Sequence, residues 1–226
     1  MDLLPKKTGN EKRIESCKKI GGAKKRKGHK REDDFKRQYN LESLKDNTEY
    51  GPTSDTSIAK NHPILVKIKN KLYFESNTNY CSNKSGNNLQ FVLGNIPELD
   101  RSDNLEWIQN KDNSRSMFNK YLKKSESDKP ADYLVYKDKL NKKWIFMLMD
   151  DIIDHIANKC KWRKLSSGRL KGDFDDDSYK GFSQYLTYEY RATHNSHFLG
   201  ANGGCGIKFI KLLKNNIKYI EDDFNY

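Results

Sequence analysis

Apolar residues along this chain recur in short, separated groups, and their spacing predicts helices and strands in turn. Phe35 and Tyr39 lie four positions apart within residues 30–41, which is the spacing of one buried helix face. Glu32 falls on that same face, so we expect its carboxylate to point inward, while the two aspartates that follow it point elsewhere. The pattern therefore predicts an early helix that carries one inward carboxylate.

The same apolar spacing predicts further helices. Asp150 is expected to N-cap one of them, and Cys160 is expected to be the last inward residue of that helix. The other predicted helices cover residues 10–20, two segments between residues 102 and 125, and residues 207–220.

Short runs of β-branched and aromatic residues predict strands. Two hairpins are expected, one about Asn70–Lys71 and one about the turn at residues 138–141, and the stretch between residues 165 and 185 is expected to be a loop rich in Gly and Asp. The predicted strands cover residues 56–59, 64–69, 72–74, 79–84, 89–93, 133–136, 144–149 and 185–191. These elements predict an α/β (α+β) domain with one mixed central β-sheet flanked by helices.

The chain has 226 residues, enough for one good core, and no break in composition demands a second domain. We expect a basic N-terminal arm at residues 1–30 and a single domain at residues 31–226, with recognition loops in its C-terminal third. The four cysteines lie far apart without Cys-x-x-Cys spacing, which indicates neither a zinc knuckle nor a disulfide framework. No apolar run approaches a membrane span or a signal peptide, so the sequence predicts a soluble cytoplasmic protein without a membrane partner.

Positive charge is concentrated at the N-terminus. The whole chain carries a net charge of +12, and residues 1–31 contribute twelve basic side chains against three acidic ones. Such an arm is typical of proteins that bind nucleic acid, because each cation that neutralises a phosphate releases condensed counterions. The alternative is a solvated tail or a targeting patch.

The run of residues 80–98 carries the most chemical information. It places Lys84 at a predicted strand end beside a glycine turn, and Asp55 and Glu32 lie upstream. Phosphodiester hydrolysis requires carboxylates that hold a divalent metal ion, a cation near the attacking water, and rigid strand ends that aim both. The three residues together therefore indicate the metal site of a nuclease.

The set Glu32, Asp55 and Ser82-x-Lys84 resembles the PD-(D/E)xK nuclease superfamily, most closely the type II restriction endonucleases. In that family an Asp at one strand end, an acidic residue two positions before a Lys, and often a helical Glu ligate the metal ions. The resemblance covers residues 28–98. It implies a restriction-endonuclease-like fold, Mg²⁺ as cofactor and cleavage of double-stranded DNA.

The chain departs from the family pattern at two positions. Ser54 replaces the Pro before Asp55, which affects only the shape of the turn. Ser82 stands where the family has an acid, and a neutral hydroxyl cannot replace an anionic ligand. In a known variant of the family the carboxylate moves to a later residue, a role for which Glu98 is suitably spaced from Lys84. Glu32 is the rival, and its inward facing favours it.

The resemblance assigns a role to each residue. Asp55, with Glu32 or Glu98, would hold Mg²⁺ through oxygen ligands that suit a hard ion. Lys84 would lower the pKa of the attacking water or stabilise the pentavalent charge. The alternatives are a turn residue for Asp55, a solvated strand end for Lys84 and an ordinary helix start for Glu98.

Two other patterns match less well. Pro130-Ala131-Asp132 has the letters of the motif, but no acid-x-Lys pair follows on the next predicted strand, so Asp132 is expected to be a turn residue. His194 and His197 suggest a metal site of the HNH type, yet the glycines of residues 200–204 interrupt the helix that this site requires.

Cations, amides and aromatic side chains mix in two turn-rich segments of the C-terminal half, where they are suited to contact phosphates and base edges. The alternative is an exposed basic hairpin. With the arm, the expected DNA-binding residues are Lys24, Lys25, Arg26, Lys27, Arg163, Lys164, Arg169, Lys171, Arg191, His194 and Asn195.

These observations predict a type II restriction endonuclease that cuts a specific palindromic site as a homodimer. The size and the Lys- and Asn-rich composition resemble an eight-base cutter of this family, which implies an A·T-rich target whose deformability contributes to recognition. A non-catalytic DNA-binding protein and a nuclease with another role, such as repair, are the alternatives.

Overall fold

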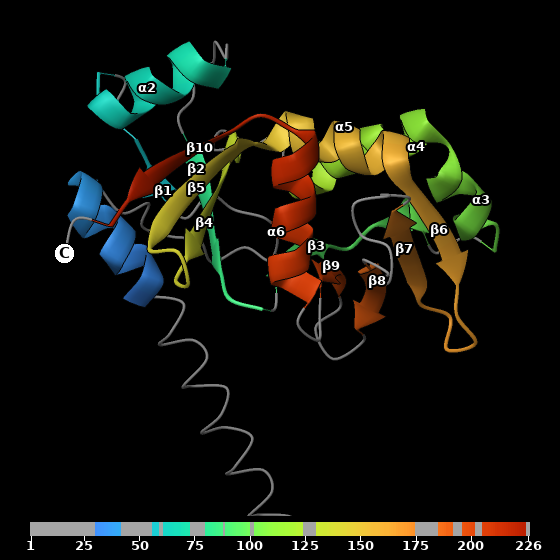
Figure 1. Cartoon of the computed structure of the whole chain (residues 1–226). Coiled ribbons are helices and arrows are strands. Elements are labelled where there is room, and N and C mark those ends of the chain that lie inside the picture. Colours follow the sequence, from blue (N-terminus) through green and yellow to red (C-terminus); the bar gives the residue numbers. More distant parts are fainter. Residues whose placement is uncertain are drawn as a thin grey trace, which may run out of the picture.

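The computed structural model describes residues 30–41, 56–58, 61–72, 80–87, 89–99, 102–123, 130–174, 185–191, 196–201 and 205–224. They form a mixed α+β fold with two five-stranded sheets (Figure 1). The first sheet has the order β1 (Thr56–Ser57), β2 (Tyr80–Ser85), β4 (Tyr133–Asp138), β5 (Lys143–Leu148) and β10 (Tyr219–Asp223). The second has the order β3 (Leu89–Gly94), β9 (Ser196–Ala201), β8 (Tyr185–Arg191), β7 (Leu170–Phe174) and β6 (Cys160–Lys164).

The first sheet is mixed because β2 and β4 run parallel while its other pairs are antiparallel. The chain makes the crossover that a parallel pair requires through β3 and the helices before β4. The second sheet is antiparallel throughout. The predicted single central sheet is thus corrected to two sheets: β3 pairs with β9 and not with its neighbour in sequence, β2. Periodicity predicts a strand but not its partner.

The helices cover these sheets unevenly. A helix of residues 30–39 and α2 (Pro63–Leu72) lie beside the first sheet, whereas α3, α4 and α5 lie along the second and α6 lies between (Figure 1). The remaining helical elements are η1 (Pro97–Leu99), α3 (Asn104–Gln109), α4 (Lys111–Phe118), the π-helical turn η2 (Asn119–Lys123), α5 (Met149–Lys159) and α6 (Cys205–Asn216). Among the described residues, no helix is long and apolar enough to cross a membrane.

The two faces of the first sheet bury different cores. One face packs Tyr133, Val135 and Phe146 against Phe35 of the early helix and Leu65 of α2. The opposite face contributes Leu134, Tyr136, Ile145 and Met147 to a larger core that it shares with the second sheet and with α4, α5 and α6. The first sheet is therefore buried on both sides, as strand runs without polar alternation require.

Several sequence predictions are confirmed. The helix with inward Phe35 and Tyr39 is present, and both side chains are buried. The strands predicted at residues 79–84, 89–93 and 185–191 and the hairpin about residues 138–141 are also present. The helix predicted at residues 10–20 lies outside the described residues.

Residues 64–72 form α2 and not the predicted hairpin. Ile64, Leu65, Ile68 and Leu72 are spaced so that one helix face is buried, and Pro63 occupies the first helical position, where its missing N–H costs nothing. The β-branched residues of this run had favoured a strand, and burial against the sheet outweighed that propensity.

Other differences concern element ends and short strands. Asp150 lies in the first turn of α5, after Leu148 at the N-cap, and Cys160 begins β6. The strands β7, β9 and β10 were not predicted. β7 lies within the expected Gly- and Asp-rich loop, and its Gly172 leaves room for the side chains of Cys160 and Trp162 on β6.

A buried ion pair attaches the early helix to the first sheet. Lys137 of β4 donates to the Asp34 carboxylate at 2.7 Å, and their side chains are 7% and 18% exposed. The Lys137 ammonium also lies 5.0 Å from the Trp144 ring and 4.9 Å from the Phe224 ring. Asp34 therefore does not point away from the core as expected, because the buried cation requires a carboxylate partner.

Replacing Asp34 with Asn should lower the free energy of unfolding by about 2–4 kcal/mol, because it leaves Lys137 buried without its counter-ion. Asp33→Asn is the matched control, since Asp33 is 60% exposed and lies 3.8 Å from Lys36, and it should cost less than about 0.5 kcal/mol. Urea unfolding measures both values. Equal losses in the two variants would show that the pair does not hold the helix.

Candidate active site

The parallel strands β2 and β4 end at the same edge of the first sheet, and the candidate site lies there. Lys84 and Ser85 end β2 opposite Tyr136 and Lys137 of β4. The Tyr136 hydroxyl donates to the Gly86 carbonyl at 3.1 Å, which fastens the turn after β2 to the neighbouring strand. Side chains at the carboxyl ends of adjacent strands are held rigidly, which suits a functional site.

Lys84 projects toward the second sheet. Its ammonium lies 5.2 Å from the centroid of the Phe91 ring on β3, within the range of a cation–π contact. Ser82 projects to the same face, because side chains alternate along a strand, and it is only 1% exposed. A buried neutral hydroxyl at this position leaves the anionic ligand to be supplied from elsewhere.

Asp55 lies outside the described residues. The residue that follows it, Thr56, begins β1 and pairs with Cys81 of β2 in an antiparallel register. The chain directly after Asp55 therefore runs beside the strand that carries Ser82 and Lys84.

Glu32 lies at the same end of β2 as Lys84. The Arg31 guanidinium lies 3.4 Å from the Ser85 hydroxyl oxygen and 3.4 Å from the Glu32 carboxylate, so one cation joins the helix to the strand end. Ser85 and Lys84 project to opposite faces of the sheet. Glu32 therefore approaches this edge from the face opposite to that of Lys84.

Glu98 lies on η1, which follows the C-terminal end of β3. Its carboxylate accepts hydrogen bonds of 2.8 and 3.1 Å from the Tyr121 hydroxyl and lies 3.5 Å from the Lys120 ammonium. Partial burial alone would raise the pKa of Glu98, but a backbone hydrogen bond, Tyr121 and Lys120 together lower it. Glu98 is thus ionised at neutral pH and engaged by Tyr121 and Lys120 of η2.

The described residues contain no group of three or more His, Cys, Asp and Glu side chains that could hold a metal ion. Asp55 lies outside that part of the chain. Glu32, partly exposed at the strand end, offers the hard oxygen donor that Mg²⁺ prefers.

Four of the expected DNA-binding cations lie on the β6–β7 hairpin, and three of them are exposed. Arg163 pairs with Asp173 at 2.9 Å, Arg169 pairs with Glu189 at 3.3 Å, and Lys164 donates to Asn104 at 3.3 Å. Lys171 is half-buried on β7. The remaining candidates, Lys24, Lys25, Arg26, Lys27, His194, Asn195 and the side chain of Arg191, lie outside the described residues.

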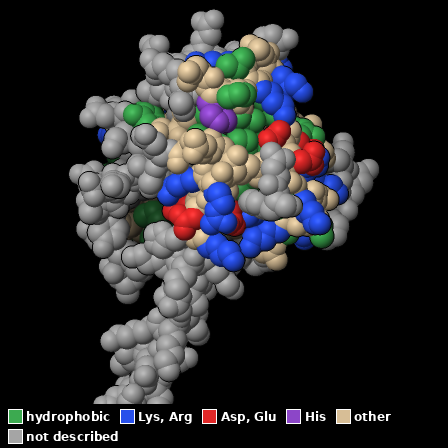
Figure 2. Space-filling view, turned by 90° about the vertical axis from the view of Figure 1, so that its left-hand side faces the viewer, with side chains coloured by type: hydrophobic (Ala, Val, Ile, Leu, Met, Phe, Trp, Pro, Cys, Tyr) green, Lys and Arg blue, Asp and Glu red, His purple; other side chains and the backbone are tan. Residues whose placement is uncertain are grey.

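The described part of the early helix, residues 30–39, lies beside the candidate site, because Arg31 contacts Ser85 at the end of β2. Figure 2 shows the side of the molecule to which this helix belongs, where Lys and Arg side chains gather in the lower part of the coloured surface.

Asp132 has a structural position. It is 3% exposed directly before β4, its carboxylate accepts from the Tyr80 amide at 3.3 Å, and its carbonyl accepts from the Met149 amide at 2.9 Å. These bonds join the beginnings of β2, β4 and α5, which agrees with the expected turn role. His197 is buried on β9, where its ring accepts from the Ile96 amide at 2.9 Å.

Sequence reasoning missed Arg31 and the buried pair of Asp34 and Lys137. A signal was present for the pair, because Lys137 interrupts an otherwise apolar strand that is buried along its length. A lysine in such a run requires a carboxylate partner. No comparable signal marked Arg31, whose contact depends on how the helix docks.

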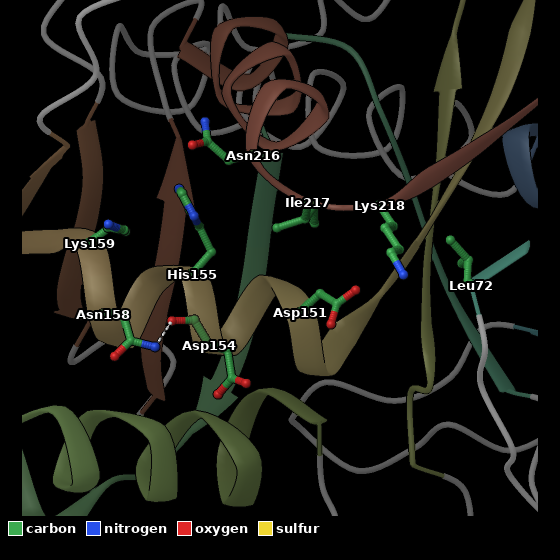
Figure 3. A pocket seen from close by; sticks show the side chains of 9 residues that line it. All are labelled: Leu72, Asp151, Asp154, His155, Asn158, Lys159, Asn216, Ile217 and Lys218. Atoms are coloured by element: carbon green, nitrogen blue, oxygen red, sulfur yellow. Dashed lines mark hydrogen bonds between the residues drawn. The ribbon is translucent and has the colours of Figure 1, made fainter.

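A separate groove of about 430 Å³ lies between α5 and the connection from α6 to β10 (Figure 3). Burial, and then the neighbouring Asp150 and Asp154, raise the pKa of Asp151 in this groove, while Lys218 opposes them. Asp154 is paired with Arg115 at 2.6 Å, and Asp150 with Lys123 at 2.7 Å. Two of these three carboxylates are therefore already neutralised by cations of neighbouring helices.

Comparison with protein-family models, with curated proteins and with solved structures finds no match to this chain. What the site can do therefore rests on the residues of this chain.

We expect Tyr121→Phe to raise the pKa of Glu98 toward its ordinary value of 4.5, because the variant removes the hydroxyl that donates to the ionised carboxylate. Since the folded-state pKa is lowered, the stability that Glu98 contributes is present above its ordinary pKa and is lost as the pH falls through the folded value. NMR titration of the Glu98 carboxyl carbon measures the shift. An unchanged pKa in the variant would contradict the assigned hydrogen bond.

Proposed function

We propose that this protein is a Mg²⁺-dependent endonuclease that hydrolyses phosphodiester bonds in double-stranded DNA, with its active site at the carboxyl ends of β2 and β4. The observation that supports the proposal is a lysine near the carboxyl end of one of two parallel strands, with a carboxylate near the same strand end on the opposite face of the sheet. Lys84 is the last residue but one of β2, and Glu32 is linked to Ser85 at that end through Arg31.

Each residue has a role that follows from its chemistry. The Lys84 ammonium, held beside β3, stabilises the negative charge that develops on the phosphorus centre or lowers the pKa of the attacking water. Asp55 and Glu32 bind the metal ion. Mg²⁺, when bound, supplies Lewis-acid stabilisation of the phosphoryl oxygens. Arg31 positions Glu32 and is within reach of a DNA phosphate at the same edge.

The wider proposal is a type II restriction endonuclease. The basic arm supports binding to a long polyanion, and the exposed cations of the β6–β7 hairpin provide a second surface for phosphates. Cutting both strands of a palindrome requires two sites related by two-fold symmetry, so we propose a homodimer. The Lys- and Asn-rich composition supports an A·T-rich target.

One observation favours a second candidate, a non-catalytic DNA-binding protein. Ser82, at the family's acidic position, is buried and neutral, as it would be in a site that had lost its metal. The arm would then carry the whole function. A nuclease that serves in repair is a further reading of the same catalytic residues.

Incubation of plasmid DNA with the protein, in Mg²⁺ and then in EDTA, separates these candidates. Discrete fragments that require Mg²⁺ support a restriction endonuclease, and a smear supports a nuclease without sequence preference. Absence of cutting with retained binding supports the DNA-binding protein and contradicts the proposed activity.

Lys84→Ala should reduce the single-turnover cleavage rate by about 10²–10³-fold or more and leave DNA affinity within about tenfold, because the lysine acts on the transition state. Asp55→Asn should also abolish metal-dependent cutting. Lys111→Ala, at an exposed position on α4, is the control and should cleave at the normal rate. Normal turnover in Lys84→Ala would show that this lysine is not part of the active site. Normal turnover in Asp55→Asn would contradict the assignment of the whole motif.

A further inference from the structure

The turn between β4 and β5 exposes a leucine. Leu140 is 84% exposed, whereas the next most exposed large hydrophobic side chain in the described part of the chain, Tyr190, is 48% exposed. Turn tips are ordinarily occupied by polar residues and gain no stability from an apolar side chain in water. A leucine presented in this way contributes nothing to the fold.

The backbone of this turn is fixed. One carboxylate oxygen of Asp138 accepts the amides of Leu140 at 3.1 Å and Asn141 at 3.2 Å, and the other accepts the Asn141 side chain at 2.8 Å. Lys142 has a φ of 53°, and its carbonyl accepts from the Phe224 amide at 3.0 Å. Leu140 is thus held out on a rigid support.

Cations flank the leucine. Lys139 and Lys142 are exposed on either side of the tip, while Lys143 is paired with Asp223 at 2.6 Å. The tip therefore combines one projecting apolar side chain with two ammonium groups. The Asp138 carboxylate between the strands is used to cap the turn.

The turn lies at the same edge of the sheet as the candidate active site. Lys84 is opposite Tyr136, and the chain continues along β4 toward the tip, so Leu140 lies at most about 13 Å farther along the strand direction. Figure 1 shows this turn at the lower end of the first sheet, near the lower end of the early helix. One polyanion lying along this edge would meet Lys84 and the tip.

We propose that Leu140 is a wedge that enters the minor groove of duplex DNA and separates a base step, while Lys139 and Lys142 bind the phosphates on either side. Apolar side chains of this size unstack base steps when cations hold the adjacent backbone. A lipid surface is the less suitable partner, because a single leucine buries too little apolar area for membrane binding. The inference rests on the proposed function only for the position of the wedge, about four base pairs from the cleaved bond.

Permanganate oxidation tests the wedge, because this reagent attacks thymines that have lost their stacking. The full-length protein is bound to plasmid DNA in EDTA, which prevents cutting, and reactive thymines are mapped by primer extension. We expect the wild type to produce reactive thymines. In Leu140→Ala the thymine reactivity should fall by about fivefold or more, while the DNA affinity stays within about tenfold of the wild type. Val66→Ala removes another exposed apolar side chain, 44% exposed on α2, and should behave as the wild type.

The outcomes separate the wedge from the nuclease. If reactive thymines persist in Leu140→Ala, the wedge is overturned and the nuclease is unaffected. The same holds if the wild type binds and cleaves DNA without producing reactive thymines. A signal that depends on Leu140 in a protein that never cleaves supports the wedge and contradicts the nuclease. Binding to phosphatidylcholine–phosphatidylserine vesicles that depends on Leu140, without reactive thymines, overturns the wedge in favour of a membrane surface.

Discussion

The ion pair between Lys137 and Asp34 is the interaction on which the geometry of the candidate site depends. It fixes the helix of residues 30–39 on the first sheet, and Gln38 and Tyr39 extend the attachment through hydrogen bonds of 2.7 and 2.6 Å to Trp144 and Asp222. Because the helix is held along its described length, Arg31 contacts Ser85 at the end of β2 and Glu32 lies next to it. Burying a charge pair costs desolvation free energy, and here two aromatic rings and a carboxylate around the Lys137 ammonium offset that cost. The pair also fixes the direction of the helix, which a purely apolar contact would not do.

The two sheets differ in strand pairing, and they present different side chains at their edges. The parallel pair β2–β4 gives the first sheet an edge near which Lys84, Arg31 and the β4–β5 turn lie, whereas the antiparallel second sheet presents cations on the β6–β7 hairpin. The face of the first sheet that carries Lys84 is also the face that shares a core with the second sheet. The proposed function would place catalysis at the edge of the first sheet and phosphate binding on the hairpin of the second, so the proposed substrate is a duplex long enough to touch both.

Local patterns in the sequence were enough for much of the fold. Phe35 and Tyr39 at helical spacing gave the early helix, and the apolar runs of β4 and β5 gave their hairpin. The pattern failed where local propensity and burial disagreed, as in α2, whose β-branched run became a helix because one of its faces packs on the sheet. It also failed where strands depend on distant partners. β9 and β10 complete sheets begun more than fifty residues earlier, which no local window records.

The residues proposed for the candidate site follow from local patterns, whereas their arrangement does not. Lys84 near a strand end and Glu32 on a helix face follow from local periodicity. In the structure Arg31, next to Glu32, contacts the end of β2 from the sheet face opposite to Lys84. The position of Glu98 beside Tyr121 depends on tertiary packing and was not visible in the sequence, whereas Lys137 within a buried strand signalled a carboxylate partner without identifying Asp34. Spacing from Lys84 alone had placed Glu98 near the motif, and in the structure its carboxylate is engaged by Tyr121 and Lys120.

The most direct test of this site is to compare two glutamate variants by single-turnover cleavage of plasmid DNA in Mg²⁺. Gln keeps the shape of the side chain and removes its charge, so the comparison isolates which carboxylate replaces the acid missing at Ser82. We predict that Glu32→Gln abolishes cleavage and that Glu98→Gln, whose carboxylate is engaged by Tyr121 and Lys120, reduces it less. Full activity in Glu32→Gln with none in Glu98→Gln would contradict a metal site at the end of β2 and move it to η1.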